Sequence, residues 1–187
     1  MPSDADTLHA DIEQLHSQLL SKSPIYNFLL QDIKFISLQP PPSPPTPTPS
    51  PSAFVQATLQ LSNIHLNSHN SLHGAVAATI VDWVGGIVIA SLPRHSPSAT
   101  TTTTAPVEPP SALTTPRGVS VDIHLRYLSA AAKLGDTLII RAWSHKLGRS
   151  LAFVTVQLAV EKPDKSSASG STSQICVVEA SHTKYIS

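Results

Sequence analysis

The stretch over residues 75–92, AVAATIVDWVGGIVIASL, decides the fold because its apolar side chains would surround a helix on every side. A helix of this kind must be enclosed on most sides, and a curved sheet wrapped around it would enclose it. The stretch also reaches about the 18-residue length at which a membrane span is considered. Asp82 near its middle and the two glycines disfavour insertion into a bilayer. We therefore expect a buried helix over about residues 72–92, ended by Pro93.

Strand-like patterns lie on both sides of this helix, and another helical pattern precedes them over about residues 3–22, with Ser3 as its N-cap. The strand-like segments are residues 33–38 and 53–61 before the helix, and residues 119–128, 137–145, 151–161 and 174–185 after it. Successive strands joined by short turns favour an antiparallel sheet. One such sheet with one central helix is an α+β architecture.

Three tracts rich in Pro, Ser and Thr interrupt these elements, at about residues 40–52, 94–116 and 162–172. They lack the apolar side chains that a packed core requires. Each falls between two predicted elements, where extra length costs little entropy. We therefore predict one domain over residues 1–187 that carries these tracts as inserts.

The composition excludes several classes of protein. Twelve basic and 12 acidic side chains leave no net charge, which argues against a general nucleic-acid binder. The single cysteine, Cys176, can form neither an intrachain disulfide nor a cysteine zinc site, so a reducing compartment is expected. The N-terminal stretch MPSDADTLHADIEQ is acidic and lacks the features of a secretory or transit signal. We expect a cytoplasmic protein without a membrane span, and a mitochondrial location stays open.

Asp82, within TIVDWV, is the sharpest chemical signal. An ionised carboxylate in an apolar helix is costly unless it is bonded or used. Burial is expected to raise the pKa of this carboxyl group toward a value useful to a general base. A structural role, with the carboxylate bonded to nearby backbone or paired across a subunit contact, is an equal alternative.

The segment HLNSHNSLHGA, residues 65–75, precedes the apolar helix. Its Asn67, His73 and Gly74 are polar or small where a helix N-terminus presents free N–H groups, which can bind a developing oxyanion. An ordinary capped helix start would look the same. Three histidines spaced by four residues would form a metal-binding face in a helix. The Asn and Ser residues around them favour a loop, so we expect no metal site.

The segment GVSVDIHLRY, residues 118–127, alternates strictly. The predicted polar face consists of Ser120, Asp122, His124 and Arg126. Such a face is usually exposed to solvent. Ser120 does not lie in a G-x-S-x-G elbow, which argues against a serine hydrolase. In the turn HKLGRSLAF, Lys146 and Arg149 could bind a phosphorylated ligand, although basic hairpin tips are more often solvated.

Together these segments resemble the hotdog-fold thioesterases of the PaaI-like group. The matching segments are HLNSHNSLHGAVAATIVDWV, RGVSVDIHLRYLSAAAKLGDTLIIRA, HKLGRSLAFVTVQLAV and SHTKY. The similarity runs from about residue 33 to residue 185, apart from the inserts. In that family an antiparallel sheet wraps a long helix, two subunits join their sheets edge to edge, and dimers commonly pair. The resemblance therefore implies a hotdog fold of about six strands and a homodimer, or a dimer of dimers.

The resemblance also implies roles for single residues. Asn67 and the N–H of Gly74, in a motif that begins with His73, would polarise the thioester carbonyl. Asp82, helped by Ser120, would orient and deprotonate the attacking water without a metal, a cofactor or a covalent serine. The implied coenzyme A contacts are Tyr127, Leu128, Ser129, Lys133, Lys146, Leu147, Gly148, Arg149, Ser150, Leu151 and Tyr185.

Two departures from the family pattern affect the expected site. Ala75 replaces the second glycine of the family's HGG motif, and its methyl group would narrow the site near the thioester. The loop between Tyr127 and Lys133 is one residue longer than usual, which affects the expected nucleotide contacts more than the chemistry.

The expected activity is hydrolysis of acyl-coenzyme A to the free acid and coenzyme A. One alternative is a thioesterase acting on acyl or polyketide chains bound to a carrier protein. Another is a non-catalytic acyl-binding protein whose Pro-rich inserts recruit partners. The joint presence of Asn67, Gly74, Asp82 and Ser120 counts against the non-catalytic alternative. Neither acyl length nor a preference for aromatic or aliphatic groups follows from the sequence.

Overall fold

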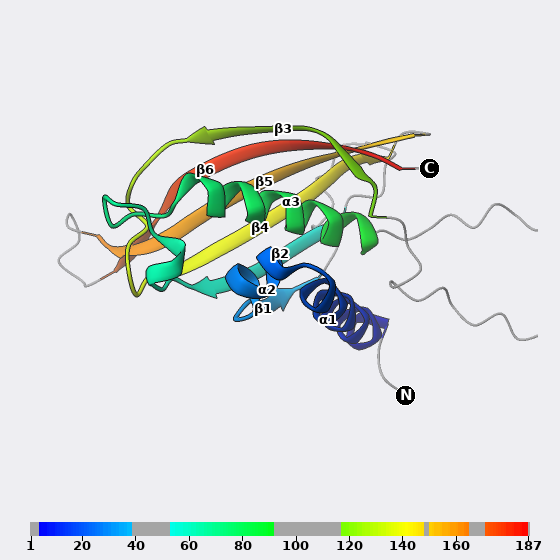
Figure 1. Cartoon of the computed structure of the whole chain (residues 1–187), viewed down its shortest axis with the longest axis horizontal. Coiled ribbons are helices and arrows are strands. Elements are labelled where there is room, and N and C mark those ends of the chain that lie inside the picture. Colours follow the sequence, from blue (N-terminus) through cyan, green and yellow to red (C-terminus); the bar gives the residue numbers. More distant parts are fainter. Residues whose placement is uncertain (1–3, 39–52, 92–116, 148–149, 165–170, 187) are drawn as a thin grey trace, which may run out of the picture.

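The computed structural model describes residues 4–38, 53–91, 117–147, 150–164 and 171–186. Their elements are α1 (Asp4–Lys22), α2 (Pro24–Leu30), β1 (Lys34–Ser37), β2 (Phe54–Gln60), the 3₁₀ turn η1 (Asn63–His65), α3 (Gly74–Ala90), β3 (Val119–Tyr127), β4 (Thr137–Leu147), β5 (Leu151–Pro163) and β6 (Thr172–Tyr185) (Figure 1). This order is the predicted one except for α2 and the short turn η1, which the sequence pattern did not reveal.

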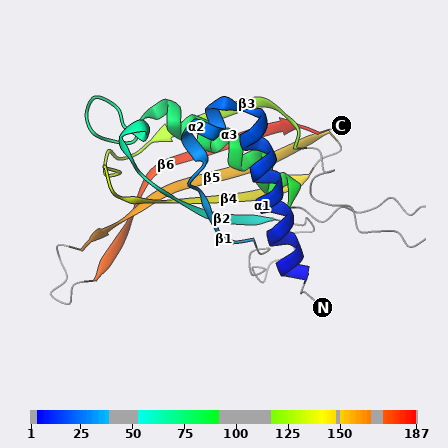
Figure 2. The ribbon, with the colours of Figure 1, turned by 60° about the horizontal axis from the view of Figure 1, so that its bottom comes forward.

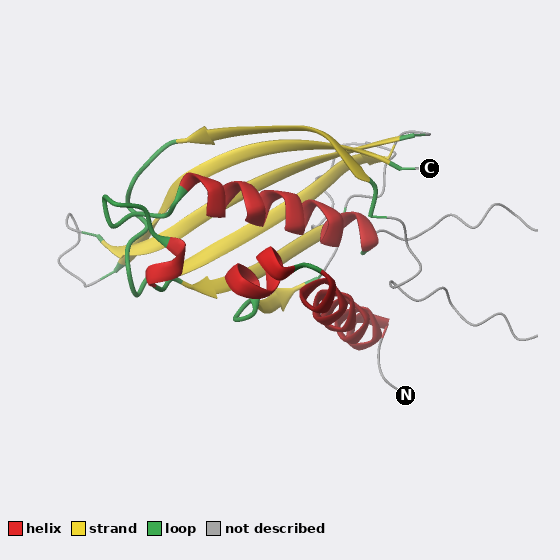
Figure 3. Ribbon diagram, viewed as in Figure 1, coloured by secondary structure: helices red, strands yellow, loops and turns green. Residues whose placement is uncertain are grey.

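The six strands form one sheet in the order β1-β2-β4-β5-β6-β3, and every neighbouring pair is antiparallel. The sheet curves around α3, which lies along one of its faces (Figure 3). β1 and β3 are the two edge strands. The predicted α+β hotdog architecture is thus confirmed.

α3 packs against the sheet through nearly its whole length. Ile80, Val84 and Ile87 are fully buried on it, and Leu138 and Leu158 are fully buried on the sheet. Burial of each such side chain stabilises the fold by roughly 1.5–3 kcal/mol. No helix among the described residues is long and apolar enough to cross a bilayer.

The first turn of α3 begins at Gly74, two residues later than expected, because His73 caps it. The Nδ1 atom of His73 accepts a hydrogen bond from the Ala75 N–H at 3.0 Å. This bond satisfies one of the N–H groups that a helix leaves without an internal partner. The described part of the chain ends at Ser91 here, so the predicted stop at Pro93 lies outside it.

α1 and α2 lie beside α3 (Figure 2), and in the view of Figure 1 they lie on the β1 side of it. Ile12 of α1 is fully buried, and the ring of His16 packs edge-on against Trp83 of α3. α2 begins at Pro24 after Ser23, whose hydroxyl accepts a hydrogen bond from the Tyr26 N–H. Proline suits the first position of a helix because its missing N–H would have no partner there.

The hairpin between β5 and β6 is longer than predicted. Pro163 still pairs with Thr172, so the expected insert over residues 162–172 is wrong at both ends. Main-chain pairing does not require apolar side chains, and the polar composition of this tract therefore concealed it. The other two predicted inserts, residues 40–52 and 94–116, lie outside the described residues.

Candidate active site

The carboxylate of Asp82 accepts hydrogen bonds from two hydroxyl groups on different elements. Ser120 of β3 donates to Oδ1 at 2.7 Å, and Tyr26 of α2 donates to Oδ2 at 2.7 Å. The Nζ atom of Lys184 lies 3.5 Å from Oδ1. The Asp82 side chain is 35% exposed. Asp82 is therefore bonded on both oxygens and still accessible to a small molecule.

A β-bulge in β3 turns Ser120 toward Asp82. Ser120 pairs with Lys184 and Asp122 pairs with Thr183, so the intervening Val121 is an extra residue on the β3 side. One extra residue reverses the alternation on one side of the bulge, and bulges are frequent beside active sites. The predicted placement of Ser120 on the outer face is therefore wrong. Ser120 is itself exposed at the edge of the sheet, as are the other three residues of that predicted face.

Two buried side chains of β6 complete the cluster, and sequence reasoning assigned neither of them. The Nε2 atom of His182 lies 3.0 Å from the Ser120 hydroxyl, and Lys184 donates to the same oxygen at 3.2 Å. They are 1% and 6% exposed, respectively. A Cβ atom at Gly85 of α3 would collide with the His182 ring, so glycine at this position lets the ring approach.

A signal for these two residues was present in the sequence. In β6 the inward-facing positions alternate, and Val178 and Ala180 are followed on the same face by His182 and Lys184. Polar side chains that continue an apolar row are candidates for a buried site. Tyr26 offered no such signal, because it lies in a short helix far from Asp82 in the sequence.

The charges and hydrogen bonds around Asp82 shift several pKa values. Burial alone would raise the pKa of Asp82, but the hydrogen bonds from Ser120 and Tyr26 and the charges of Lys184 and His182 outweigh it and lower this pKa. The expectation of a raised pKa was therefore wrong. Burial lowers the pKa of both His182 and Lys184. The carboxylate therefore stays ionised and His182 is neutral at neutral pH.

The predicted oxyanion residues lie at the start of α3. The Oδ1 atom of Asn67 accepts hydrogen bonds from the N–H groups of His69 and Ser71, at 2.9 and 3.2 Å. The Gly74 carbonyl accepts a hydrogen bond from Tyr127 at 3.1 Å. A Cβ atom at Gly74 would lie only 3.2 Å from the Tyr127 hydroxyl, so glycine permits this approach.

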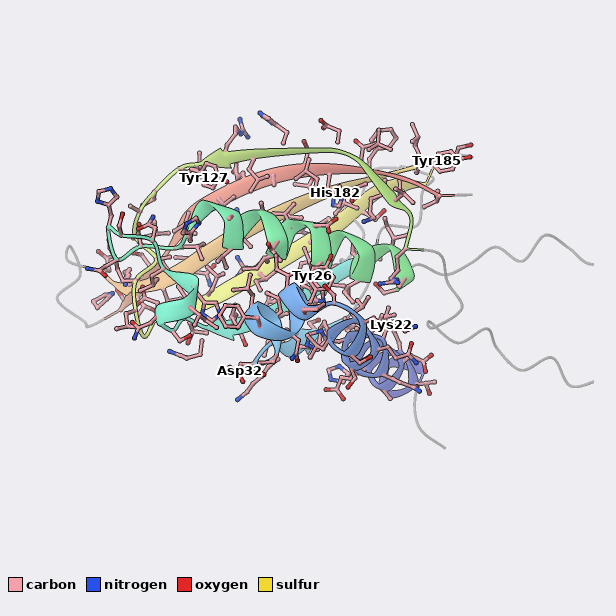
Figure 4. All side chains as sticks on the ribbon, in the orientation of Figure 1. Lys22, Tyr26, Asp32, Tyr127, His182 and Tyr185 are labelled. Atoms are coloured by element: carbon pink, nitrogen blue, oxygen red, sulfur yellow. The ribbon has the colours of Figure 1, made fainter. Side chains whose placement is uncertain are left out.

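The structure does not bring these residues to Asp82 within one chain. Asp82 follows Gly74 by eight residues in α3, which corresponds to about 12 Å along the helix axis. In Figure 4, Tyr127 lies at one end of α3, whereas Tyr26 and His182 lie farther along it. The predicted catalytic set therefore falls into two groups, which are Asp82 with Ser120, and Asn67 with His73 and Gly74.

Two cavities meet at Asp82, Ser120 and Tyr26, which line both of them. The larger, of about 580 Å³, is also lined by Trp83, Arg117, Lys184 and Tyr185. The smaller, of about 450 Å³, is also lined by Ile25, Ala78, Thr79 and Ile123. Within the described ranges, no group of three His, Cys, Asp or Glu side chains could hold a metal ion.

The predicted coenzyme A contacts are dispersed. Tyr185 lines the larger cavity. Tyr127, Leu128, Ser129 and Lys133 are exposed along the far end of β3 and the loop after it. Ser150 and Leu151 lie at the start of β5, where the Ser150 carbonyl accepts a hydrogen bond from the Ile186 N–H. Gly148 and Arg149 lie outside the described residues, as do the side chains of Lys146 and Leu147.

The pattern of the Thioesterase superfamily matches residues 69–167, more than half of the chain. The chain belongs to the Thioesterase superfamily. Acyl-coenzyme A thioesterase 13 of Homo sapiens is 30% identical over 112 residues, which cover 60% of this chain and 65% of the relative. The match thus spans slightly less than two thirds of that relative's length. Acyl-coenzyme A thioesterase 13 of Mus musculus is 25% identical over 153 residues, which cover 82% of this chain and 86% of the relative.

Several solved structures share the fold. Zebrafish thioesterase superfamily member 2 matches with a TM-score of 0.63 and 25% identity, over 94% of this chain and 96% of the other. The Escherichia coli PaaI protein matches with a TM-score of 0.57 and 15% identity, over 96% of both chains. A hypothetical thioesterase protein from Streptococcus pneumoniae, solved with coenzyme A, matches with a TM-score of 0.56 and 18% identity, over 88% of this chain and 95% of the other. The resemblance to PaaI-like hotdog thioesterases is confirmed.

Proposed function

We propose that this thioesterase-superfamily protein hydrolyses acyl-coenzyme A to the free acid and coenzyme A, with Asp82 as the base. The observation that carries the proposal is the Asp82 carboxylate, which accepts a hydrogen bond on each oxygen and lines two neighbouring cavities. Support for the substrate comes from relatives named acyl-coenzyme A thioesterase 13 and from the structural neighbour solved with coenzyme A.

In this mechanism Asp82 takes a proton from a water molecule that attacks the thioester carbonyl. Ser120 keeps the carboxylate oriented toward that water. The carbonyl oxygen becomes negatively charged, and the Asn67 amide and the Gly74 N–H would bind it. Since the Asn67 Oδ1 atom already accepts bonds within its loop, the amide N–H groups are the end that can serve a ligand. Collapse of the intermediate breaks the C–S bond, and Asp82 returns its proton to the departing sulfur.

The contacts of Ser120 argue against a covalent serine mechanism. In a Ser-His-Asp triad the carboxylate accepts from the histidine, which in turn accepts from the serine. Here Ser120 donates directly to Asp82. Asp82 lies on the Nε2 side of the His182 ring, 3.8 Å from that nitrogen, and Ser120 lies on the same side. The carboxylate of a triad would instead bind Nδ1.

We further propose that each site combines residues of two chains. Reacting groups must approach to about 3–3.5 Å, whereas Gly74 and Asp82 of one chain are about 12 Å apart along α3. β3, which carries Ser120, is an edge strand of the sheet. Its Val119 and Val121 are 71% and 61% exposed. Edges of this kind are normally covered or paired. Pairing of two β3 edges would cover them in a homodimer, and the family resemblance extends this to a dimer of dimers.

The proposal is tested with a panel of acyl-coenzyme A esters of short, long and aromatic acyl groups, by following release of the free thiol. We expect turnover of at least one ester at a rate typical of enzymes, roughly 1–10³ per second. Each active acyl group is then offered on a carrier protein as well. Faster turnover of the carrier-protein form would mean that the carrier-protein thioester, rather than acyl-coenzyme A, is the substrate. Binding without thiol release from any ester would contradict the proposed hydrolysis.

A further inference from the structure

Tyr26 reaches the candidate base from a part of the chain that the superfamily pattern does not match. It lies in α2, 56 residues before Asp82, whereas the matched region begins at residue 69. Its hydroxyl nevertheless donates to Asp82 Oδ2 at 2.7 Å, the same distance at which Ser120 donates to Oδ1. The roles proposed for Asn67, Gly74, Asp82 and Ser120 do not account for the Tyr26 hydroxyl.

α2 is anchored well enough to place a hydroxyl group accurately. Its own last two residues, Leu29 and Leu30, are buried, at 8% and 0% exposure. The Leu29 carbonyl lies 2.9 Å from the Nε2 atom of the buried His65, in the segment that leads to α3. Ser23 caps the start of the helix. The position of Tyr26 is thus fixed from both ends of α2 rather than by its contact with Asp82 alone.

We propose that Tyr26 is a positioning residue of the active site, whose hydroxyl fixes the second oxygen of Asp82 so that the carboxylate cannot rotate away from the attacking water. This inference rests on the proposed thioester hydrolysis. Hydroxyl groups that donate to the two oxygens of a carboxylate restrict its rotation, because rotation in either direction would break a charge-assisted hydrogen bond. Tyr26, Asp82 and Ser120 together form the wall between the two cavities, where the thioester would lie.

The titratable groups around Asp82 come from α2, from β6 and from the residue before β3. His182 and Lys184 face the carboxylate from β6. The positive charge of Arg117, just before β3, acts to lower the pKa values of both Tyr26 and Lys184. Burial and the Asp82 carboxylate raise the pKa of Tyr26, so its hydroxyl remains a donor throughout the neutral range. Because this hydrogen bond helps to lower the pKa of Asp82, its removal should raise that pKa.

The test is Tyr26→Phe, which keeps the ring in both cavity walls and removes only the hydroxyl group. We expect kcat to fall about tenfold with KM changed by less than about twofold, the loss expected for one hydrogen bond to a charged group. We also expect the acid limb of the pH profile of kcat to move to higher pH. A purely structural role of Tyr26 would move neither the profile nor kcat selectively.

Phe28→Leu is the matched control. Phe28 lies in the same short helix, two residues later, and is 60% exposed. Its substitution changes a side chain of α2 that does not donate to Asp82 and lines neither cavity, so kcat and the pH profile should match those of the wild type. An equal loss in both variants would mean that any change in α2 disturbs the site, and the positioning role would be overturned.

A readout independent of activity separates this inference from the proposed function. Carboxyl-labelled aspartate in the full chain allows Asp82 to be titrated by ¹³C NMR, with its signal assigned from Asp82→Asn. We expect Asp82 in Tyr26→Phe to titrate at higher pH than in the wild type, even if no acyl-coenzyme A ester is hydrolysed. Unchanged titration, or wild-type kcat together with an unchanged pH profile, would overturn the role of Tyr26.

Discussion

α3 carries two regions of opposite character, one around Asp82 and one at Gly74. At Asp82, side chains from α2, β3 and β6 converge on one half-buried charge. At Gly74 the available groups are backbone N–H groups and the short side chains of an exposed loop. The first region is suited to activating water and the second to binding an oxyanion. Since about 12 Å of helix separates them, one chain contains two half-sites rather than one whole site.

The largest effect is expected at the Asp82 region itself. Asp82→Asn should lower kcat by roughly 10² to 10⁴ with little change in KM, because the base is lost while the shape is kept. The Asn side chain can still accept from Ser120, and the Tyr26 hydroxyl can rotate to accept from the new amide. Steady-state kinetics on the best acyl-coenzyme A ester measures this, with circular dichroism to verify the fold. Hydrolysis at nearly the wild-type rate would assign Asp82 to structure alone.

A smaller loss is expected for Ser120→Ala, which removes one donor to Asp82 and one partner of His182. We expect kcat to fall about 10- to 100-fold, the range for one hydrogen bond to a charged group. Ser181→Ala is the control, because Ser181 is exposed on the outer face of β6. Equal kinetics for the two variants would show that Ser120 does not act on the base.

The smallest effect is expected at the Gly74 region, for Tyr127→Phe. This substitution removes only the hydrogen bond to the Gly74 carbonyl, made by a side chain that is 60% exposed. Exposed hydrogen bonds contribute little, so kcat should change by less than about threefold. A loss of kcat as large as that of Ser120→Ala would mean that the Gly74 region depends on side-chain contacts as much as the Asp82 region does.

The fold could be predicted because its signals are local in the sequence. The apolar residues on all sides of α3 and the alternation of the strands are visible in short windows, and they predicted α3 and the six strands. α2 was missed because its seven residues give too few turns to show a period. The ends of β5 and β6 were missed because main-chain pairing continues into polar sequence.

The candidate site could be predicted only where one residue departs from its local pattern. Asp82 was recognisable as a charge in an apolar helix. Tyr26 was not, because its contact spans 56 residues and no pattern reports such a distance. Ser120 was assigned to the wrong face because a single extra residue in β3 reverses its side-chain direction. Its importance came from the family resemblance rather than from alternation.

Complementation between two inactive variants tests most directly whether two half-sites of different chains combine. Asn67→Ala and Asp82→Asn, each nearly inactive alone, are given different affinity tags, mixed in equal amounts and refolded together. By two-fold symmetry about half of the dimers should be mixed, each with one intact site, so roughly a quarter of wild-type activity should return. Isolation of doubly tagged dimers controls for assembly. Mixed dimers that are no more active than the two parents would contradict the account, because Asn67 and Asp82 would then serve one site within one chain.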